Sequence, residues 1–292
     1  MADFNLASVR RLHVIGVGGA GMSALAKLLS QGGVTVSGSD LRGGIELAAL
    51  ADIGVNTWSG HHPERIGDVD LVVASSAVPD DDPELVASVR RGLPLWRRPE
   101  LLAELTAMIP TIGPTGTHGK TTTTALLILG ARAAGMDPSF VVGGELVDLA
   151  TNAHRGTDPL LVLEVDEAFG TFERLSLDGL IVTSVEAEHL DYFGSTERME
   201  ATYCEVASRV NGPVVCCVDD PGAVRVKEAA SAIGYGLAEG ADWRIIDLQE
   251  RPASVDFVLH GGADAIDVSI PRPGKHVAAN AAGAIALLAE LG

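Results

Sequence analysis

The chain has 292 residues, 47% of them hydrophobic and 21% charged, which describes an ordinary globular protein with room for about two domains. The net charge of −18 argues against a nucleic-acid surface and against docking on an anionic membrane, because both need a basic footprint. Three cysteines, two of them adjacent, offer neither a disulfide framework nor a metal-binding spacing, so we expect a reducing, cytoplasmic setting.

The first elements in chain order are a strand, a glycine-rich turn and a helix. Residues 1–11 lack the apolar core of a signal peptide, and no uninterrupted apolar segment of the chain reaches membrane-spanning length. His13–Ile15 predicts a short buried strand, apolar residues then recur at helical spacing up to Leu29, and Val34–Ser37 predicts a second strand. The turn has the spacing G-x-G-x-x-G, and Asp40 stands about 20 residues further on, as in a dinucleotide-binding fingerprint.

This turn predicts a site for a nucleotide diphosphate without choosing the nucleotide. Glycines and a helix N-terminus bind any diphosphate, whether it belongs to NAD or to a nucleotide sugar, and Asp40 could take a ribose hydroxyl in either case. Taken alone, the turn would indicate an NAD-dependent dehydrogenase. The candidate residues are Gly18, Gly19, Ala20, Gly21, Met22 and Asp40.

Further strand–helix units follow. A helix is expected over Ile45–Ile53, a loop at Gly60–Pro63, and a buried strand over Leu71–Ala74. Ligands of an open parallel sheet bind beyond the carboxyl ends of its strands, so Ser75 and Ser76 stand where a ligand would be touched. The alternative for these two serines is a polar turn.

Four further polar residues of this first part have open roles. His61 and His62 are adjacent and therefore diverge, so a loop role or a ligand contact is favoured over a metal pair. Arg97 and Arg98 either contact an anion or face solvent, and a short helix, Glu100–Leu105, is expected to follow them.

A second glycine-rich turn, Gly116–Thr124, follows an apolar run at 107–112 and opens a helix expected over 125–134. Strand, turn and helix in this order suit a phosphate site, with Lys120 for the outer phosphates and the Thr121 hydroxyl for Mg²⁺. The spacing is the shorter G-T-x-G-K-T, because the first glycine of the usual phosphate loop is absent. The alternative is a Gly/Thr-rich turn that contains a lysine.

Two expected strands beyond this turn end in polar residues. Leu160–Glu167 ends in carboxylates, and the strand Leu180–Val185 is followed by Glu186–Asp191, which contains His189. Uncompensated acids are costly to bury, so we expect a cation such as Mg²⁺ beside them.

The remaining pattern predicts helices and strands to the last residue. They are a helix at 196–210, a strand at 213–218, a helix at 221–232, antiparallel strands at 243–248, 255–260 and 265–270, and a helix at 277–291. Because the chain stops in helix-forming sequence, we expect a fragment boundary there. The predicted fold is α/β: a Rossmann-like domain at 1–106, then a P-loop-type ATPase domain at 107–292 with a mainly parallel sheet and a small antiparallel extension.

With these segments in order, the sequence resembles the Mur ligases of peptidoglycan synthesis over essentially its whole length. The segments that carry the resemblance are Gly16–Met22 with Gly38–Asp40, Ser75–Val78, Arg97–Leu105, Gly116–Thr124, Glu164–Glu167, Glu186–Asp191 and Pro273–His276 with Asn280.

The resemblance implies an enzyme that joins L-alanine to UDP-N-acetylmuramate with ATP and Mg²⁺. The substrate carboxylate would attack the γ-phosphate to give an acyl phosphate, and the amino group of L-alanine would displace phosphate. Such chemistry needs positioning and charge neutralisation more than a protein nucleophile. No nucleic acid or membrane partner is implied.

The resemblance also assigns roles by position. Lys120, Glu164 and His189 would serve catalysis, with Thr121 and Glu164 on one Mg²⁺ and His189 on a second or on the acyl phosphate. The ATP site would comprise Gly116, Thr117, His118, Gly119, Lys120, Thr121, Thr122, His276 and Asn280, the last two at the adenine. The UDP-sugar site would comprise Gly18, Gly19, Ala20, Gly21, Met22, Asp40, His61, Ser75 and Ser76.

The sequence departs from the family in three respects. Ala168-Phe169 replaces a usual Ser-Asp, Pro114 replaces a small residue, and the third, C-terminal domain that closes over the family's site is not in this sequence. We therefore expect the chain to bind nucleotides better than it turns over. The alternatives are a recycling ligase that adds a tripeptide to the same UDP sugar, and a non-catalytic nucleotide-binding paralogue.

Overall fold

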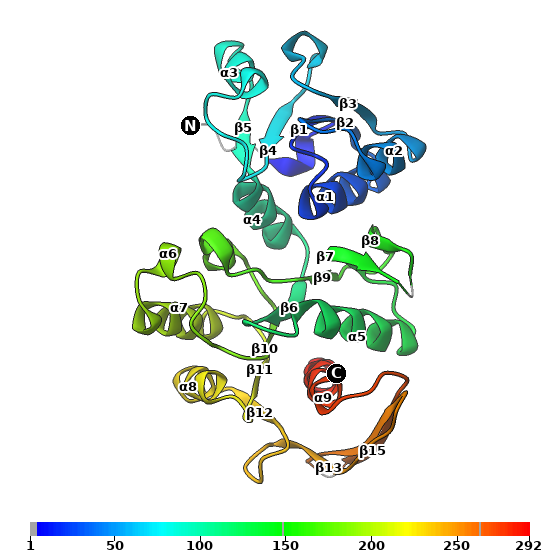
Figure 1. Ribbon diagram of the computed structural model, residues 1–292, viewed down its shortest axis with the longest axis vertical. Helices are drawn as coiled ribbons and strands as arrows, with labels where there is room; N and C mark the ends of the chain where they lie inside the picture. The colour runs from blue at the N-terminus through cyan, green and yellow to red at the C-terminus, as the bar shows by residue number, and fades with distance from the viewer. Residues whose placement is uncertain (1–4, 148, 263) are drawn as a thin grey trace. The chain divides into compact units, whose positions relative to one another are not determined.

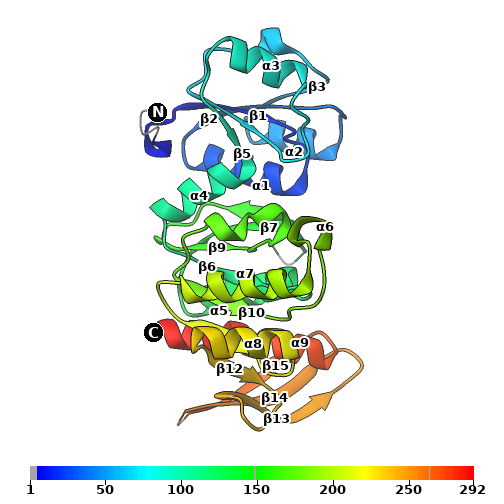
Figure 2. The same ribbon diagram turned by 90° about the vertical axis from the view of Figure 1, so that its left-hand side faces the viewer.

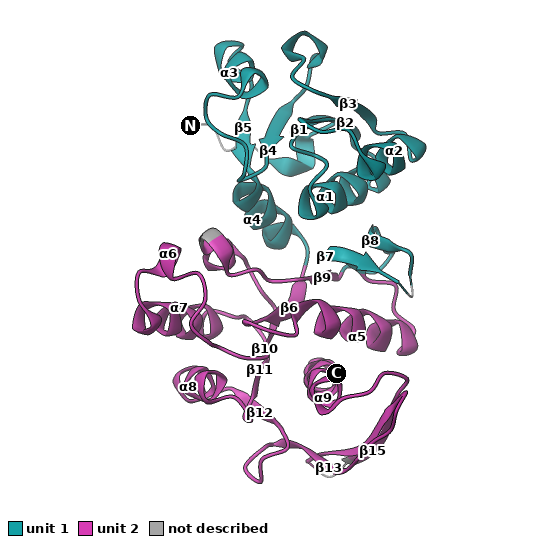
Figure 3. Ribbon diagram, in the orientation of Figure 1, with its two compact units in different colours: residues 1–109, 139–159 teal, residues 110–138, 160–292 magenta. Residues whose placement is uncertain are grey.

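The computed structural model describes residues 5–147, 149–262 and 264–292. The chain divides into two compact units (Figure 3). The first unit contains residues 1–109 and 139–159, and the second contains 110–138 and 160–292. Each unit is built around a β-sheet with helices on both faces (Figure 1).

Within the described residues, the first unit has a five-stranded parallel sheet of order β3-β2-β1-β4-β5. Its strands are β1 (Arg11–Ile15), β2 (Thr35–Asp40), β3 (Asn56–Ser59), β4 (Leu71–Ala74) and β5 (Leu95–Arg97). Its helices are α1 (Ala20–Gln31), α2 (Ile45–Asp52), α3 (Pro83–Arg90) and α4 (Arg98–Met108). The central strand β4 is entirely apolar and buried, and β1 is buried beyond Arg11, as expected of strands covered on both faces.

The second sheet comprises ten strands among the residues that the structure describes. Those of the second unit follow the order β15-β14-β13-β12-β11-β10-β6-β9. They are β6 (Thr111–Thr115), β9 (Leu161–Leu163), β10 (Gly179–Val182), β11 (Val214–Cys217), β12 (Ile233–Gly236), β13 (Trp243–Glu250), β14 (Val255–Gly261) and β15 (Asp264–Ile270). The ladder is parallel from β9 to β13, and β13, β14 and β15 pair antiparallel.

Helices cover both faces of the second unit's sheet. They are α5 (Lys120–Ala133), α6 (Leu190–Phe193), α7 (Thr196–Ser208), α8 (Pro221–Ala230) and α9 (Lys275–Leu291). In Figure 1, α5 and α9 lie on one side of the central strands and α7 and α8 on the other, and Figure 2 shows α7 and α8 in front. The alanine-rich face of α9 is buried, because small side chains let the helix approach the sheet closely.

The strands β7 (Ser139–Leu146) and β8 (Thr151–His154) form an antiparallel hairpin that belongs to the first unit. The hairpin packs on α1 through Asn152, which is 7% exposed. The Asn152 amide donates to the carbonyl of Ala20 at 3.1 Å, and the Lys27 ammonium donates to Asn152 Oδ1 at 2.9 Å. The first turn of α1 is therefore held by a segment more than a hundred residues later in the sequence.

The predicted fold class is confirmed, and several element boundaries differ from the expectations. The strands β3, β5, β7, β8 and β12 and the helices α3 and α6 were not predicted. The apolar run at 107–112 is divided, because α4 continues to Met108 and β6 begins at Thr111. Pro114 lies inside the buried strand β6, where it lacks an N–H, and its carbonyl accepts the Val165 amide at 3.0 Å. Across the described residues, no helix is long and apolar enough to cross a membrane.

Candidate functional site

The glycine-rich turn of the first unit is closed by backbone hydrogen bonds to the end of β2. The amides of Gly16 and Val17 donate to the carbonyl of Ser39 at 2.8 and 2.9 Å. The Gly18 amide donates to Asp40 Oδ2 at 2.9 Å, and a Cβ at Gly18 would lie 2.9 Å from the same oxygen. Asp40 thus fixes the shape of the turn, and residue 18 must be glycine for the carboxylate to approach.

The turn leads directly into α1, whose first-turn amides have the geometry of an anion site. The N-cap residue of α1 is Gly19, which has no side chain that could accept a hydrogen bond from the first N–H groups of the helix. Gly18, Gly19, Ala20 and Gly21 are all at least partly exposed. The Met22 side chain, in contrast, lies in the core at 2% exposure.

Ser75 lies against this turn, since a Cβ at Gly16 would be 3.0 Å from Ser75 Cβ. Arg97 braces the serine loop by donating to the carbonyls of Ser75 and Val78 at 3.2 and 2.7 Å and by pairing with Asp80. The guanidinium of Arg98 lies against Gly21, 3.2 Å from the position of a Cβ there. Arg97 is therefore a structural brace, while Arg98 stands at the first turn of α1.

His61 and His62 lie in the loop after β3, and the ring of each faces a carboxylate. His61 Nδ1 lies 3.2 Å from Asp82 Oδ2, and His62 Nδ1 lies 3.0 Å from Glu64 Oε1. Sequence reasoning did not identify Asp82. The signal was available, because Asp82 followed by Pro83 is a typical helix start, although no pattern pairs it with a loop twenty residues earlier.

The phosphate loop of the second unit lies between β6 and α5. Gly116 and Gly119 have φ angles of +130° and +86°, which favour glycine. The Lys120 ammonium donates to the Gly116 carbonyl at 2.6 Å and to Glu167 Oε1 at 3.0 Å. No side chain caps α5 at Gly119, so its first turn keeps the amide arrangement that binds phosphate.

Residues at the end of β10 hold this loop in place. The amides of Thr117 and His118 donate to Ser184 O and Ser184 Oγ, both at 3.0 Å, and the Thr183 hydroxyl donates to the His118 carbonyl at 2.6 Å. The His118 ring is 68% exposed and lies 3.9 Å from Glu186. The loop is thus shaped by the strand beside it before any nucleotide arrives.

Thr121 and Asn280 lie on either side of the start of α5. The Thr121 hydroxyl donates to Glu164 Oε1 at 3.0 Å. A Cβ at Gly119 would be 2.8 Å from Asn280 Oδ1, so the buried Asn280 lies against the loop itself. His276 is exposed in the first turn of α9, and Thr122 is half-buried.

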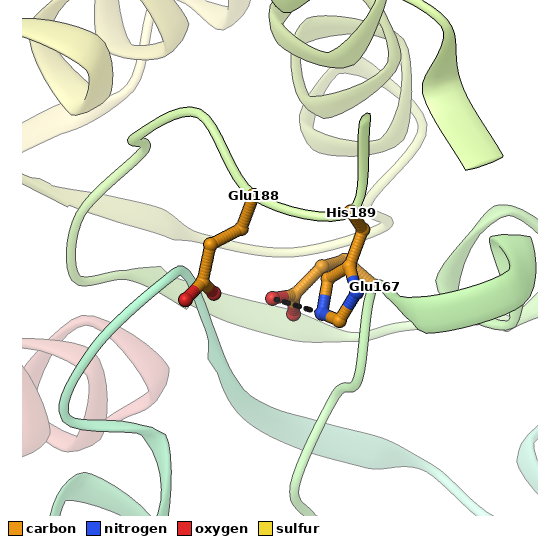
Figure 4. Close-up of side chains that lie close together, drawn as sticks. All are labelled: Glu167, Glu188 and His189. Atoms are coloured by element: carbon orange, nitrogen blue, oxygen red, sulfur yellow. Dashed lines mark ion pairs between the residues drawn. The ribbon is translucent and has the colours of Figure 1, made fainter. Parts of the chain in front are cut away.

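Glu167, Glu188 and His189 bring three ligand atoms within 4.8 Å of one another (Figure 4). Glu167 is 2% exposed and its Oε2 has no hydrogen-bond partner, while its Oε1 lies 3.9 Å from His189 Nε2. Burial raises the pKa of Glu167, and the charge of Lys120 opposes that rise. A buried carboxylate oxygen without a hydrogen-bond partner, beside two further potential metal ligands, fits a divalent cation. The carboxylate oxygens are ligands that suit Mg²⁺.

This cluster differs in membership from the metal ligands expected from the sequence. Thr121 pairs with Glu164, whereas His189 lies with Glu167 and Glu188, neither of which was assigned a role. Ala168 follows Glu167 in a short 3₁₀ turn, and the Phe169 side chain lies outside what the structure describes. The strand-end carboxylates were visible in the sequence, but the partner of each depends on how β9 and β10 flank β6.

These two units define an α/β protein with two glycine-rich turns that each lead into a helix, one of them of the P-loop type. Two family models match the sequence: "Mur ligase family, catalytic domain" over residues 11–109 and "Mur ligase middle domain" over residues 115–288. The chain belongs to the Mur ligase family.

Curated relatives agree with this assignment. The UDP-N-acetylmuramate–L-alanine ligase of Thermobifida fusca is 40% identical over 288 residues, which cover 97% of this chain and 61% of that protein. The enzyme of the same name from Rhodococcus jostii is 38% identical and is covered to 63%. The chain therefore spans less than two thirds of the length of these relatives.

Solved structures share the fold. The UDP-N-acetylmuramate–alanine ligase of Thermotoga maritima has a TM-score of 0.85 at 26% identity, covering 97% of this chain and 65% of that one. A tripeptide ligase for UDP-N-acetylmuramate from Neisseria meningitidis also has a TM-score of 0.85, at 23% identity, covering 98% of this chain and 94% of that one. At 23% identity the second match supports the fold alone.

Proposed function

We propose that the chain carries the UDP-sugar and ATP sites of a ligase that joins L-alanine to UDP-N-acetylmuramate in peptidoglycan synthesis. The observation that carries the proposal is the pairing of the phosphate loop with strand-end carboxylates, Lys120 with Glu167 and Thr121 with Glu164. A dehydrogenase would have no use for that arrangement. Residues 1–106 would hold the UDP sugar and residues 107–292 would hold ATP.

In this proposal the second unit supplies charge and position for phosphoryl transfer. Lys120 exchanges its contact with the Gly116 carbonyl for the β- and γ-phosphates, and the first-turn amides of α5 hold the remaining phosphate oxygens. Thr121 with Glu164, and Glu167 with Glu188 and His189, would hold Mg²⁺, which when bound neutralises phosphate charge. The acyl phosphate forms when the substrate carboxylate attacks the γ-phosphorus and ADP leaves. The amino group of L-alanine then attacks the acyl carbon, and phosphate leaves as the amide forms.

Ligand binding by the chain as it stands tests the first half of the proposal. Isothermal titration with UDP-N-acetylmuramate should give saturable binding that Asp40→Ala weakens, because Asp40 shapes the turn through Gly18. NADH in the parallel titration should not bind. Binding of NADH with no response to the UDP sugar would contradict the proposal and restore the dehydrogenase alternative.

Phosphate release tests the second half. In the chain extended to the length of its relatives, ATP hydrolysis should depend on Mg²⁺ and UDP-N-acetylmuramate, and L-alanine should stimulate it more than the tripeptide L-alanyl-γ-D-glutamyl-meso-diaminopimelate does. Stimulation by the tripeptide alone would favour the recycling ligase. Binding of both nucleotides without hydrolysis, in the chain extended to the length of its relatives, would favour a non-catalytic paralogue.

A further inference from the structure

Two buried carboxylates at the start of α3 hold the loop that follows β3, and no role above uses them. We call residues 60–62 the His loop. Asp82, which caps α3, is 5% exposed, and Glu84 in the first turn of the helix is fully buried. Each of the two acids binds one residue of the His loop.

Glu84 ties the backbone of the His loop to the strand end beneath the glycine-rich turn. Its Oε1 accepts the His62 amide at 2.8 Å, and its other oxygen accepts the Ser39 hydroxyl. Ser39 in turn accepts two amides of the glycine-rich turn through its carbonyl. The Gly60 amide donates to the Asp40 carbonyl at 2.8 Å, so the His loop and the turn are anchored at the same end of β2.

Asp82 acts on the His61 side chain. Its Oδ1 accepts the amides of Glu84 and Leu85 at 2.9 and 3.2 Å, as an N-cap does, and its Oδ2 lies 3.2 Å from His61 Nδ1. A carboxylate oxygen accepts hydrogen bonds and does not donate them, so its position opposite Nδ1 favours the Nδ1–H tautomer of a neutral His61 ring. The ring is 37% exposed while Asp82 is buried, which leaves Nε2 as the nitrogen available to a ligand.

The position of His61 places that nitrogen at the ligand end of the sheet. β3 pairs in parallel with β2 so that Ser59 is opposite Asp40, and the His loop begins at the next residue. Ligands of such sheets bind beyond the carboxyl ends of the strands. His61 is thus beside the turn whose amides suit a diphosphate.

We propose that Asp82 is a positioning residue of the first-unit site: it fixes His61 as the Nδ1–H tautomer, so that Nε2 accepts a hydrogen from a hydroxyl or imide group of a nucleotide sugar. The ligand part of this inference rests on the proposed function. The tautomer does not, because it is a property of the protein without ligand.

The tautomer is measured by long-range ¹H–¹⁵N correlation on the ¹⁵N-histidine-labelled chain, with the His61 signals assigned by their loss in His61→Gln. The unaltered chain should show a protonated Nδ1 and an unprotonated Nε2 at a pH where the ring is neutral. In Asp82→Asn the Nε2–H tautomer should gain population. Asparagine keeps one oxygen for the helix cap, and the NH2 group that then takes the place of Oδ2 can only donate, so it favours an unprotonated Nδ1.

The matched control is Asp81→Asn, which removes the same charge from an exposed neighbour. Titration with UDP-N-acetylmuramate should show affinity lowered about fivefold to tenfold in Asp82→Asn, the effect of one misdirected hydrogen bond, and unchanged in Asp81→Asn. Thermal unfolding of both variants should match the unaltered chain, because both keep the cap of α3.

Three results would overturn the inference. A His61 that is protonated on Nε2 in the unaltered chain contradicts the orienting role of Asp82. Equal affinity of Asp82→Asn and the unaltered chain contradicts the ligand role of Nε2. Absence of UDP-sugar binding by the unaltered chain contradicts the proposed function and the ligand role together, while the tautomer measurement still decides the orienting role.

Discussion

At the scale of single residues, the hydroxyl oxygen of Thr121 is the atom of its side chain that can coordinate a cation. We expect Thr121→Val to weaken binding of MgATP by roughly tenfold, because a hydrogen bond to a charged group contributes about 1.5–3 kcal/mol. Thr121→Ser keeps the hydroxyl and should restore the affinity. Isothermal titration measures both, and a valine variant that binds MgATP normally would remove Thr121 from the site.

Glu167 is a residue whose ionisation opposes folding. Its pKa is raised by burial above the ordinary 4.5, so any stability it contributes is present below that pH and is lost as the pH rises through the folded-state pKa. At about pH 8 we therefore expect Glu167→Gln to unfold at a higher urea concentration than the unaltered chain. The difference should vanish at about pH 4, where both side chains are neutral.

The same substitution should abolish ATP hydrolysis, because the orphaned oxygen of Glu167 is the buried acceptor in the cluster with Glu188 and His189. Higher stability with lost activity is the signature of a carboxylate kept for function. A glutamine variant that is less stable at pH 8 would show instead that the ion pair with Lys120 outweighs the burial of Glu167.

At the scale of elements, Glu84 joins α3 to the ends of β2 and β3. Burial would raise its pKa, but the His13 ring, 3.6 Å away, and the hydrogen bonds from Ser39, the His62 amide and Trp58 outweigh burial and lower the pKa from 4.5 to about 2. The corresponding stability, up to about 3 kcal/mol, is present above pH 4.5 and is lost as the pH falls towards 2. Urea unfolding should therefore show a large deficit for Glu84→Gln at neutral pH that shrinks on acidification, and a constant deficit would contradict the assignment.

The pairing of β6 with β9 depends on Gly113. A Cβ at this residue would lie 1.8 Å from the Leu163 carbonyl oxygen, a distance that the two strands can relieve only by separating. We expect Gly113→Ala to lower the midpoint of thermal unfolding by about ten degrees or more. In a chain of this size, each kcal/mol of lost unfolding free energy lowers the midpoint by about 4 °C or less. Gly67→Ala, where a Cβ would meet nothing within 4 Å, is the matched control and should unfold normally.

The elements also show how far sequence reasoning reaches. Continuous apolar runs predicted β4 and β10 because strands buried on both faces need them. The strand β3 was missed because Trp58 is its one buried residue, which leaves no pattern in four residues. The glycine and threonine spacing identified the phosphate loop, but the contact of Lys120 with Glu167 was not predictable, since it requires that β9 lie beside β6.

At the scale of the whole molecule, the net charge of −18 destabilises the folded chain through repulsion between its acidic groups. Like charges held close together repel one another, and salt screens this repulsion. We expect the midpoint of thermal unfolding to rise as NaCl is increased from about 0.01 M to about 0.3 M. A fall over that range would mean that the ion pairs, such as those of Arg97 and Arg225, outweigh the repulsion.

Because the β7–β8 hairpin belongs to the first unit, that unit can complete its folding during synthesis only after the start of the second unit has been made. The first unit is interrupted after residue 109 and resumes at 139–159, so it cannot finish packing until residue 159 has left the ribosome. By then the phosphate loop and α5 have already emerged. Until Asn152 arrives, α1 lacks the side chain that binds its first turn, and the nascent first unit presents that face of α1 uncovered. A ribosome stalled before residue 139 should therefore carry a first unit that proteases cut readily, and one stalled well beyond 159 should not.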